Sequence, residues 1–191
     1  MSDQPTVGFA LCGSFCTFSK VIPQIEKLVS GGYHVIPIMS PVAYETDTRF
    51  GKAREIRERI EAVTKNPILH TVEAVEPFGP KKLLDILVIA PCTGNTLGKL
   101  ACGIYDTAPT LSFKSHLRNA RPVVIAVSTN DGLAASARNI GQLHNMKHIY
   151  FVPYRQDDPE KKPASLVANM ELILPTVEQA LIEKQIQPVL L

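Results

Sequence analysis

The 191-residue sequence has no tryptophan, almost no excess charge of either sign and no long apolar run. Its 20 lysines and arginines nearly balance 18 acidic residues, and the net charge of +2 is not gathered into a basic run. This balance argues against a dedicated nucleic-acid-binding protein. A membrane-spanning helix needs about 18 or more consecutive apolar residues, so we expect no membrane segment and no membrane partner.

Cysteine is also scarce, with four residues at positions 12, 16, 92 and 102. The spacings Cys12-x3-Cys16 and Cys92-x9-Cys102 do not match a zinc site, so we expect no metal. The first residues lack the pattern of a secretion signal, which predicts a cytoplasmic protein with reduced thiols. Hydrophobic residues make up 45% of the sequence, which is enough to form the core of one well-buried α/β domain that spans residues 1–191.

Short apolar runs alternate with segments of helical spacing along the whole chain. The apolar runs predict buried strands at residues 7–11, 33–39, 83–90, 122–127 and 148–152. The helical patterns cover residues 18–30, 42–64, 97–104, part of 106–119, 133–146 and 165–182, and residues 155–164 are expected to form a loop. This alternation predicts a doubly wound parallel sheet of the Rossmann-like or flavodoxin-like type.

A polar turn after the third predicted strand is the most informative segment. It reads Ala90-Pro-Cys-Thr-Gly-Asn-Thr and leads directly into a helical pattern. Such a turn directs backbone N–H groups and hydroxyls into the crevice at the carboxyl end of a parallel strand, where α/β sheets bind ligands. Thr93, Asn95 and Thr96 are therefore candidate ligand-binding residues. The alternative is an ordinary turn in which a threonine or asparagine caps the helix.

Two further turns follow the first and second predicted strands. Gly13 permits a tight turn, and Ser14 and Ser40 place hydroxyls at the same predicted edge of the sheet. The usual G-x-G-x-x-G dinucleotide motif is absent. Helix capping is again the alternative for these serines.

The segment around residues 91–106 resembles the motif P-x-S-A-N-T-x-x-K-x-A-x-G-x-x-D-N of the flavin-binding cysteine decarboxylase family. That family includes phosphopantothenoylcysteine decarboxylase, peptidyl-cysteine decarboxylases and flavin prenyltransferases. The residues in register are Pro91, Asn95, Thr96, Lys99, Ala101, Gly103 and Asp106. The resemblance implies FMN as cofactor and a homo-oligomer built from trimers, with the flavin at the boundary between neighbouring copies. It assigns flavin contacts to Gly13, Ser14, Ser40, Thr93, Asn95 and Thr96.

The chain departs from this family at residues 127–130. The decarboxylase motif P-x-M-N-x-x-M-W keeps only its asparagine, as Asn130. In the family this asparagine acts on the substrate, which makes Asn130 a catalytic candidate. The lost positions and the missing tryptophan argue against cysteine decarboxylation. Ser128 stands where prenyltransferases carry a basic residue, which argues against an isoprenyl phosphate.

His70 and Cys92 are two further candidate site residues for which a structural role is the alternative. His70 lies near the place where decarboxylases carry an active-site histidine, although a lone histidine is more often structural. Cys92 lies within the ligand turn, and we interpret it as packing against the ligand because no base can be assigned to it.

Within the family, the chain looks most similar to a member that works with a second, nicotinamide-binding polypeptide. This similarity implies oxidation of a dihydropyridine-type dicarboxylate to pyridine-2,6-dicarboxylate during sporulation, with NAD or NADP on the partner polypeptide. Lys99 and Arg138, with loop amides near Asn95 and Asn130, are candidates to bind the carboxylates. The alternatives are a free-standing FMN-dependent decarboxylase or prenyltransferase, or a non-catalytic protein that retains the fold.

Overall fold

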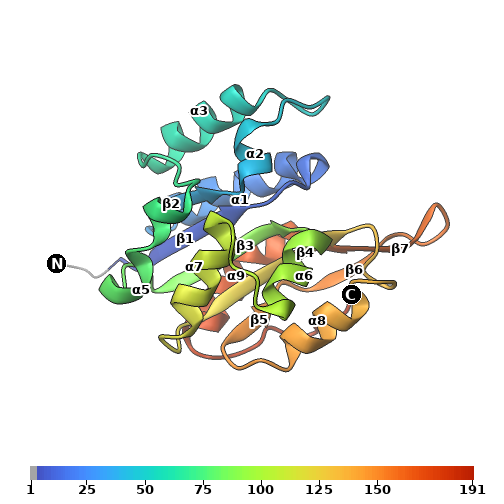
Figure 1. The fold of residues 1–191 in the computed structure, drawn as a ribbon. Coiled ribbons are helices and arrows are strands. Elements are labelled where there is room, and N and C mark those ends of the chain that lie inside the picture. Colours follow the sequence, from blue (N-terminus) through green and yellow to red (C-terminus); the bar gives the residue numbers. More distant parts are fainter. Residues whose placement is uncertain (1–3) are drawn as a thin grey trace.

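Five parallel strands form the main part of a seven-stranded sheet in the computed structural model, which describes residues 4–191 (Figure 1). The order is β2-β1-β3-β4-β7-β6, and β5 pairs with β4 beside this path. The strands are β1 (Thr6–Leu11), β2 (His34–Met39), β3 (Ile86–Cys92), β4 (Val123–Thr129), β5 (Ile149–Phe151), β6 (Tyr154–Asp158) and β7 (Lys162–Ala168). The predicted doubly wound α/β fold is therefore confirmed.

Helices cover both faces of the sheet. Helices α1 and α9 contact each other over one face, whereas α7 contacts both α5 and α6 over the other. The α-helices are α1 (Phe18–Ser30), α2 (Pro41–Glu45), α3 (Ala53–Thr64), α4 (Val72–Val75), α5 (Phe78–Lys81), α6 (Gly94–Cys102), α7 (Ala108–Leu117), α8 (Ala137–His144) and α9 (Ile173–Leu181). Two short 3₁₀ helices, η1 (Phe15–Thr17) and η2 (Met170–Leu172), precede α1 and α9.

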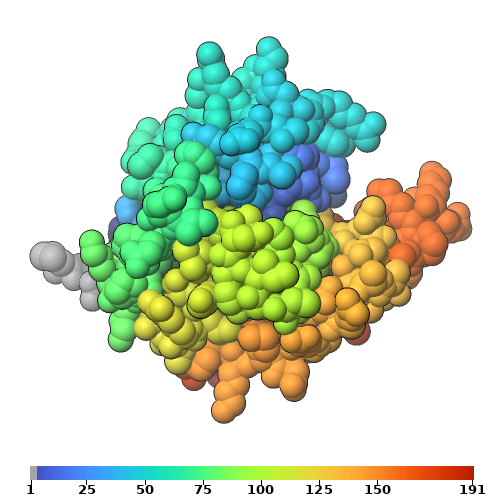
Figure 2. Space-filling view, viewed as in Figure 1, coloured from blue at the N-terminus to red at the C-terminus, as the bar shows by residue number. Residues whose placement is uncertain are grey.

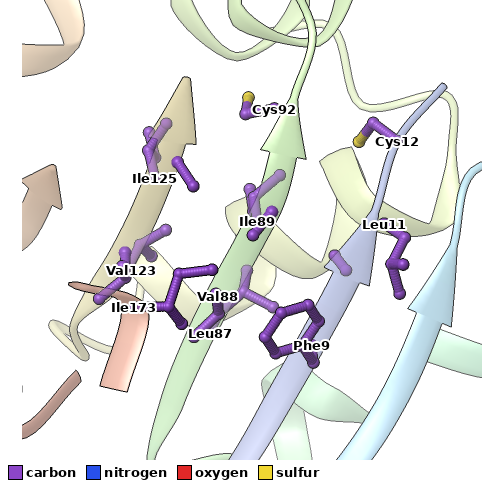
Figure 3. Packing of buried hydrophobic residues seen from close by; sticks show 14 of the residues in the cluster. Phe9, Leu11, Cys12, Leu87, Val88, Ile89, Cys92, Val123, Ile125 and Ile173 are labelled. Carbon is purple, nitrogen blue, oxygen red and sulfur yellow. The ribbon is translucent and has the colours of Figure 1, made fainter. Parts of the chain in front are cut away.

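The core lies between these layers, and the central strands supply much of it. Every residue of β3 is buried, which explains why this strand reads as a continuous apolar run. Figure 3 shows side chains of β1, β3 and β4 packed beside Ile173 of α9. Burial of each large aliphatic or aromatic side chain stabilises the fold by roughly 1.5–3 kcal/mol. The carboxyl ends of the strands are therefore fixed in position, and the turns that follow them lie at one edge.

Residues 155–182 differ from the prediction. Residues 155–164 were expected to form a loop and residues 165–182 a helix, but β6 and β7 form an antiparallel hairpin over residues 154–168. Ser128 and Thr129 at the end of β4 pair with Val167 and Leu166 of β7. The polar segment 155–164 is paired within the hairpin itself, and the contact with β4 adds the hairpin to the edge of the parallel sheet. The hairpin projects beyond the body of the molecule (Figure 2).

Two predicted helices are also shorter than expected. The segment 42–64 divides into α2 and α3, and the loop between them turns back so that Asp47 Oδ1 accepts a hydrogen bond from the Ala53 N–H at 2.8 Å. The helix expected over 133–146 begins only at Ala137, because residues 130–136 form turns. Across residues 4–191, no helix has the length and apolar character needed to cross a bilayer.

Candidate functional site

A cavity of about 710 Å³ opens at the carboxyl ends of β1, β3 and β4, beneath the hairpin. In the space-filling view it corresponds to the notch between the blue and cyan N-terminal segments and the orange hairpin (Figure 2). The segment after β1 and the first turn of α1 contribute Gly13, Ser14, Phe15, Cys16, Thr17 and Lys20 to the lining. The segment that leads from β3 into α6 contributes Thr93, Gly94 and Asn95, and the end of β4 with the turn after it contributes Ser128, Thr129, Asn130 and Asp131. Phe50 and the hairpin residues Asp157, Lys162, Ser165, Leu166 and Val167 complete it.

Three hydroxyl groups meet on one wall of this cavity. Ser14 Oγ lies 2.8 Å from Ser128 Oγ and 3.1 Å from Thr17 Oγ1, and Thr17 Oγ1 lies 2.9 Å from Ser128 Oγ. Ser14 precedes the helix η1, but its side chain does not cap that helix. The Ser14 hydroxyl, for which both a capping and a ligand-binding role were considered, therefore faces the end of β4.

The turn after β3 contains the N-cap of α6 and also lines the cavity. Thr93 caps α6 by accepting a hydrogen bond from the Thr96 N–H at 3.3 Å, so the capping alternative applies to Thr93 even though it also lines the cavity. Thr96 is buried, and its hydroxyl bonds to that of Thr93 at 3.0 Å. Asn95 is exposed and lines the cavity. The first amides of α6 have no intrahelical acceptor, which leaves them available for other partners.

An ionised carboxylate lies beside these amides. Asp131 Oδ1 accepts a short hydrogen bond from the Thr129 hydroxyl. This bond and a second one from Ser136 lower the pKa of the Asp131 carboxyl. A Cβ atom built on Gly94 would lie 2.6 Å from Thr129 Oγ1, 2.7 Å from Asp131 Oδ1 and 2.9 Å from Ser136 Oγ. A side chain at position 94 would therefore displace at least one of these three groups.

Two lysines in the lining were not identified from the sequence. Lys20 is exposed on the first turn of α1, and Lys162 at the start of β7 pairs with Asp157 at 2.7 Å. The sequence signal that could have identified Lys20 is its position four residues after Cys16, a helical spacing that continues from the first turn. Lys162 gave no signal, because its segment was expected to be a loop.

Several predicted residues lie outside the cavity lining. Ser40 caps α2 by accepting a hydrogen bond from the Ala43 N–H at 3.3 Å. His70 stacks on the ring of Tyr44, with the ring centroids 3.7 Å apart. Of the eight predicted site residues, Gly13, Ser14, Thr93, Asn95 and Asn130 line the cavity, whereas Ser40, Thr96 and His70 do not.

The two residues expected to bind carboxylates lie outside the cavity lining. Lys99 forms an ion pair with Asp106, with an N–O distance of 2.7 Å, and lies outside the lining. Arg138 is exposed on α8 and also lies outside it. Both residues were selected from local sequence position, which does not report the direction of a side chain.

The thiols divide into buried and exposed groups. Cys92 is fully buried at the end of β3, near Cys12 at the end of β1, and burial raises its pKa well above the usual value (Figure 3). The same effect raises the pKa of Cys12 to about 11. Neither residue lines the cavity, so Cys92 packs in the core and not against a cavity ligand. Among the described residues, no cluster of three histidine, cysteine or acidic side chains is arranged to hold a metal ion.

The cavity is suited to a flavin mononucleotide. The hydroxyls of Ser14, Thr17 and Ser128, together with Lys20, can bind a phosphate, since phosphate accepts hydrogen bonds and is anionic. Phe15 and Leu166 offer apolar surface for a ring system. Gly13 and Gly94 both line the cavity, where they add backbone surface without a side chain.

Comparison with known proteins identifies one matching family and a relative that covers nearly the whole chain. The sequence model described as Flavoprotein matches residues 1–179. The B subunit of dipicolinate synthase from Bacillus subtilis (strain 168) is 45% identical over 184 residues, which cover 96% of this chain and 92% of that protein.

Two solved structures extend the comparison. The crystal structure of the dipicolinate synthase B subunit from Bacillus halodurans has a TM-score of 0.90 and 45% identity, covering 98% of this chain and 96% of that chain. The FMN-dependent cysteine decarboxylase SpaF has a TM-score of 0.66 and 25% identity, covering 94% of this chain and 96% of that chain. The chain belongs to the flavoprotein family.

Proposed function

We propose that this chain is the B subunit of a dipicolinate synthase, which forms pyridine-2,6-dicarboxylate from a dihydrodipicolinate-type precursor during sporulation. The observation that carries the proposal is the 45% identity over 96% of the chain to a protein of that name. The cavity supports it, because its lining combines hydroxyls and lysines with an apolar wall.

The dicarboxylate is bound by Lys162 on the hairpin side of the cavity, whereas Lys20 on the α1 side binds the phosphate of the cofactor. These two lysines replace Lys99 and Arg138 as the cationic candidates. Asn130 at the end of β4 is the catalytic candidate on this chain, since its amide both donates and accepts hydrogen bonds. His70 stays a weaker candidate, because it stacks on Tyr44 outside the cavity.

FMN is the cofactor that we assign to this cavity. Bound flavin supplies a hydride acceptor for oxidation of the dihydropyridine ring. The residues of this chain hold it in place: Gly13, Ser14, Thr93 and Asn95 line the cavity directly, and Ser40 and Thr96 order the turns after β2 and β3. The partner is the A subunit of dipicolinate synthase, a nicotinamide-binding dehydrogenase that uses NAD or NADP.

We further propose a cytoplasmic homo-oligomer built from trimers, in which a neighbouring copy covers the cavity. The segment from Gly94 to Thr107 has an apolar helical spacing and is a candidate contact surface, but its Leu97 and Leu100 are buried within the fold. Ile104 of this segment is exposed, as are Val42 and Phe50, and these three side chains are available for contact with a neighbouring copy. Light scattering at micromolar protein concentration tests this assembly, and a monomer would contradict it.

Coexpression with candidate dehydrogenase chains, followed by an assay for dipicolinate, tests the function. We expect dipicolinate only when both chains are present, together with a yellow preparation that has flavin absorbance. Full activity of the dehydrogenase chain in isolation would show that the present chain is non-catalytic.

A further inference from the structure

Positive and negative groups lie in different parts of the cavity lining, and the assignment of flavin to the cavity does not by itself explain this separation. Lys20 and the three bonded hydroxyls form one part of its lining, whereas the ionised Asp131 lies beside the N-terminus of α6. A helix N-terminus attracts an anion because of its partial positive charge. At the N-terminus of α6, the Asp131 carboxylate is that anion. An anionic group of a ligand is therefore favoured near Lys20 and disfavoured near Gly94.

Asp131 is held in one orientation by its neighbours. The hydroxyls of Thr129 and Ser136 donate to its carboxylate, and Gly94 leaves the space that the carboxylate needs. A carboxylate has about four acceptor positions, and these two hydroxyls use only two of them. Since Asp131 is in the cavity lining, the remaining acceptor capacity is accessible to a ligand with an N–H donor.

The neighbouring residues offer donors. Gly94 and Asn95 at the start of α6 line the cavity together with Asn130 and Asp131, and their backbone and side-chain amides are hydrogen-bond donors. This wall thus presents one strong acceptor together with donors. The imide edge of an oxidised flavin ring has the complementary arrangement, with a single ring N–H, at N3, between two carbonyl groups.

We propose that the Asp131 carboxylate accepts a hydrogen bond from the N3–H of the flavin ring and orients the ring with its imide edge toward the N-terminus of α6. This proposal rests on the proposed function, because it needs FMN in the cavity. Asp131 acts as a positioning residue that directs the phosphate of the cofactor away from α6 and toward Ser14 and Lys20. The negative charge of Asp131 also disfavours a substrate carboxylate at the same place.

Fluorescence titration with FMN and with 3-methyl-FMN, which lacks the N3–H, tests the proposal. Both ligands carry the same phosphate, so the ratio of their dissociation constants cancels the repulsion between phosphate and Asp131. We expect wild-type protein to bind FMN at least about tenfold more tightly than 3-methyl-FMN, the scale of one hydrogen bond to a charged group. In Asp131→Asn the ratio should shrink about fivefold, because the acceptor becomes neutral.

Two further variants sharpen the test. Asp157→Asn removes another carboxylate from the cavity lining, at the hairpin, and should keep the wild-type ratio. Gly94→Ala places a methyl group against Asp131 and should reduce the ratio as Asp131→Asn does, which gives a second route if Asp131→Asn fails to fold. Thermal melting of each protein without ligand establishes that it is folded.

The outcomes separate the two proposals. If wild-type protein binds FMN but the ratio is the same in wild-type, Asp131→Asn and Gly94→Ala proteins, the role of Asp131 is wrong and the function survives. If wild-type protein binds no FMN at micromolar concentration, the cofactor assignment fails and the role of Asp131 fails with it.

Discussion

The hydroxyl oxygens of Ser14 and Ser128 lie 2.8 Å apart and join the turn after β1 to the end of β4. The two residues are 114 positions apart in the chain. Thr17 bonds to both, so the three hydroxyls form a closed triangle. This triangle joins the carboxyl ends of β1 and β4 that border the cavity. Its three hydroxyl protons serve its own three bonds, so a bound phosphate accepts a hydrogen bond from a hydroxyl that turns away from its neighbour.

The first prediction tests this triangle through Ser128→Ala. The change removes two hydrogen bonds of the triangle and should cost about 1–2 kcal/mol in the free energy of unfolding, while FMN binding weakens about tenfold. Urea unfolding and flavin titration measure the two effects. Ser112→Ala is the matched control, because it removes a buried hydroxyl that bonds to Ala108 O away from the cavity lining. Equal loss of FMN affinity in both variants would show that the effect is only global destabilisation.

Asn130→Leu should lower turnover of the reconstituted two-chain enzyme about tenfold or more, the scale of one or two hydrogen bonds to a charged group. Its melting temperature should change little, since Asn130 is exposed and α8 begins only after Ser136. Dipicolinate formation and thermal melting are measured on the same preparation. Normal turnover would remove Asn130 from the active site.

Lys162→Gln should raise the KM for the dicarboxylate substrate about tenfold, because one charge-assisted hydrogen bond is lost. Lys99→Gln is the matched control: its ammonium group also pairs with an aspartate, Asp106, but outside the cavity, and this pair contributes at most about 1 kcal/mol to stability. Steady-state kinetics of both variants compare the two lysines. A similar rise in KM for Lys99→Gln would contradict the assignment of Lys162.

Gly132→Ala should destabilise the hairpin. A Cβ atom at Gly132 would lie 2.6–2.7 Å from Leu166 of β7, and such overpacking costs about 1–3 kcal/mol. In contrast, a Cβ atom at Gly141 of α8 meets nothing within 4 Å, and Gly141→Ala should stabilise the protein by up to about 1 kcal/mol. Urea unfolding of both variants checks the difference in sign.

Stability should fall as the pH decreases from 6.5 toward 4 because of His116. Burial lowers the pKa of this histidine from 6.5 to about 4, and its Nε2 lies 3.0 Å from Pro122 O. Between these pH values the unfolded chain binds a proton that the folded protein excludes, so folding loses up to about 3 kcal/mol. The stabilisation is complete above pH 6.5.

His116→Gln removes this titration and should flatten the pH dependence of the unfolding free energy between pH 7.5 and 4.5. His34→Gln changes an exposed histidine and serves as the control that should retain the wild-type slope. An unchanged slope in His116→Gln would assign the acid sensitivity to other groups.

Much of the sheet could be predicted from the sequence alone. The apolar runs of β1, β3 and β4 identify buried strands because both of their faces are covered, and α1 has the predicted bounds because its apolar spacing ends at a pair of glycines. The turn at Thr93 and Asn95 was likewise placed correctly at the carboxyl end of β3, since strand and helix patterns meet there. These features depend on neighbours a few residues away, and local periodicity reports them.

The tertiary structure alone decided which polar side chains share the cavity. The hairpin exists because β7 pairs with the end of β4, a partner more than 30 residues earlier that its own polar pattern does not reveal. Lys162 reaches the cavity only through that pairing, and Asp131 obtains its place only because Gly94 leaves room for it. Ser40 and Lys99, in contrast, satisfy a helix end and an ion pair nearby. A side chain's direction depends on contacts between distant segments, so sequence position identified the edge of the sheet, whereas packing determined the composition of the site.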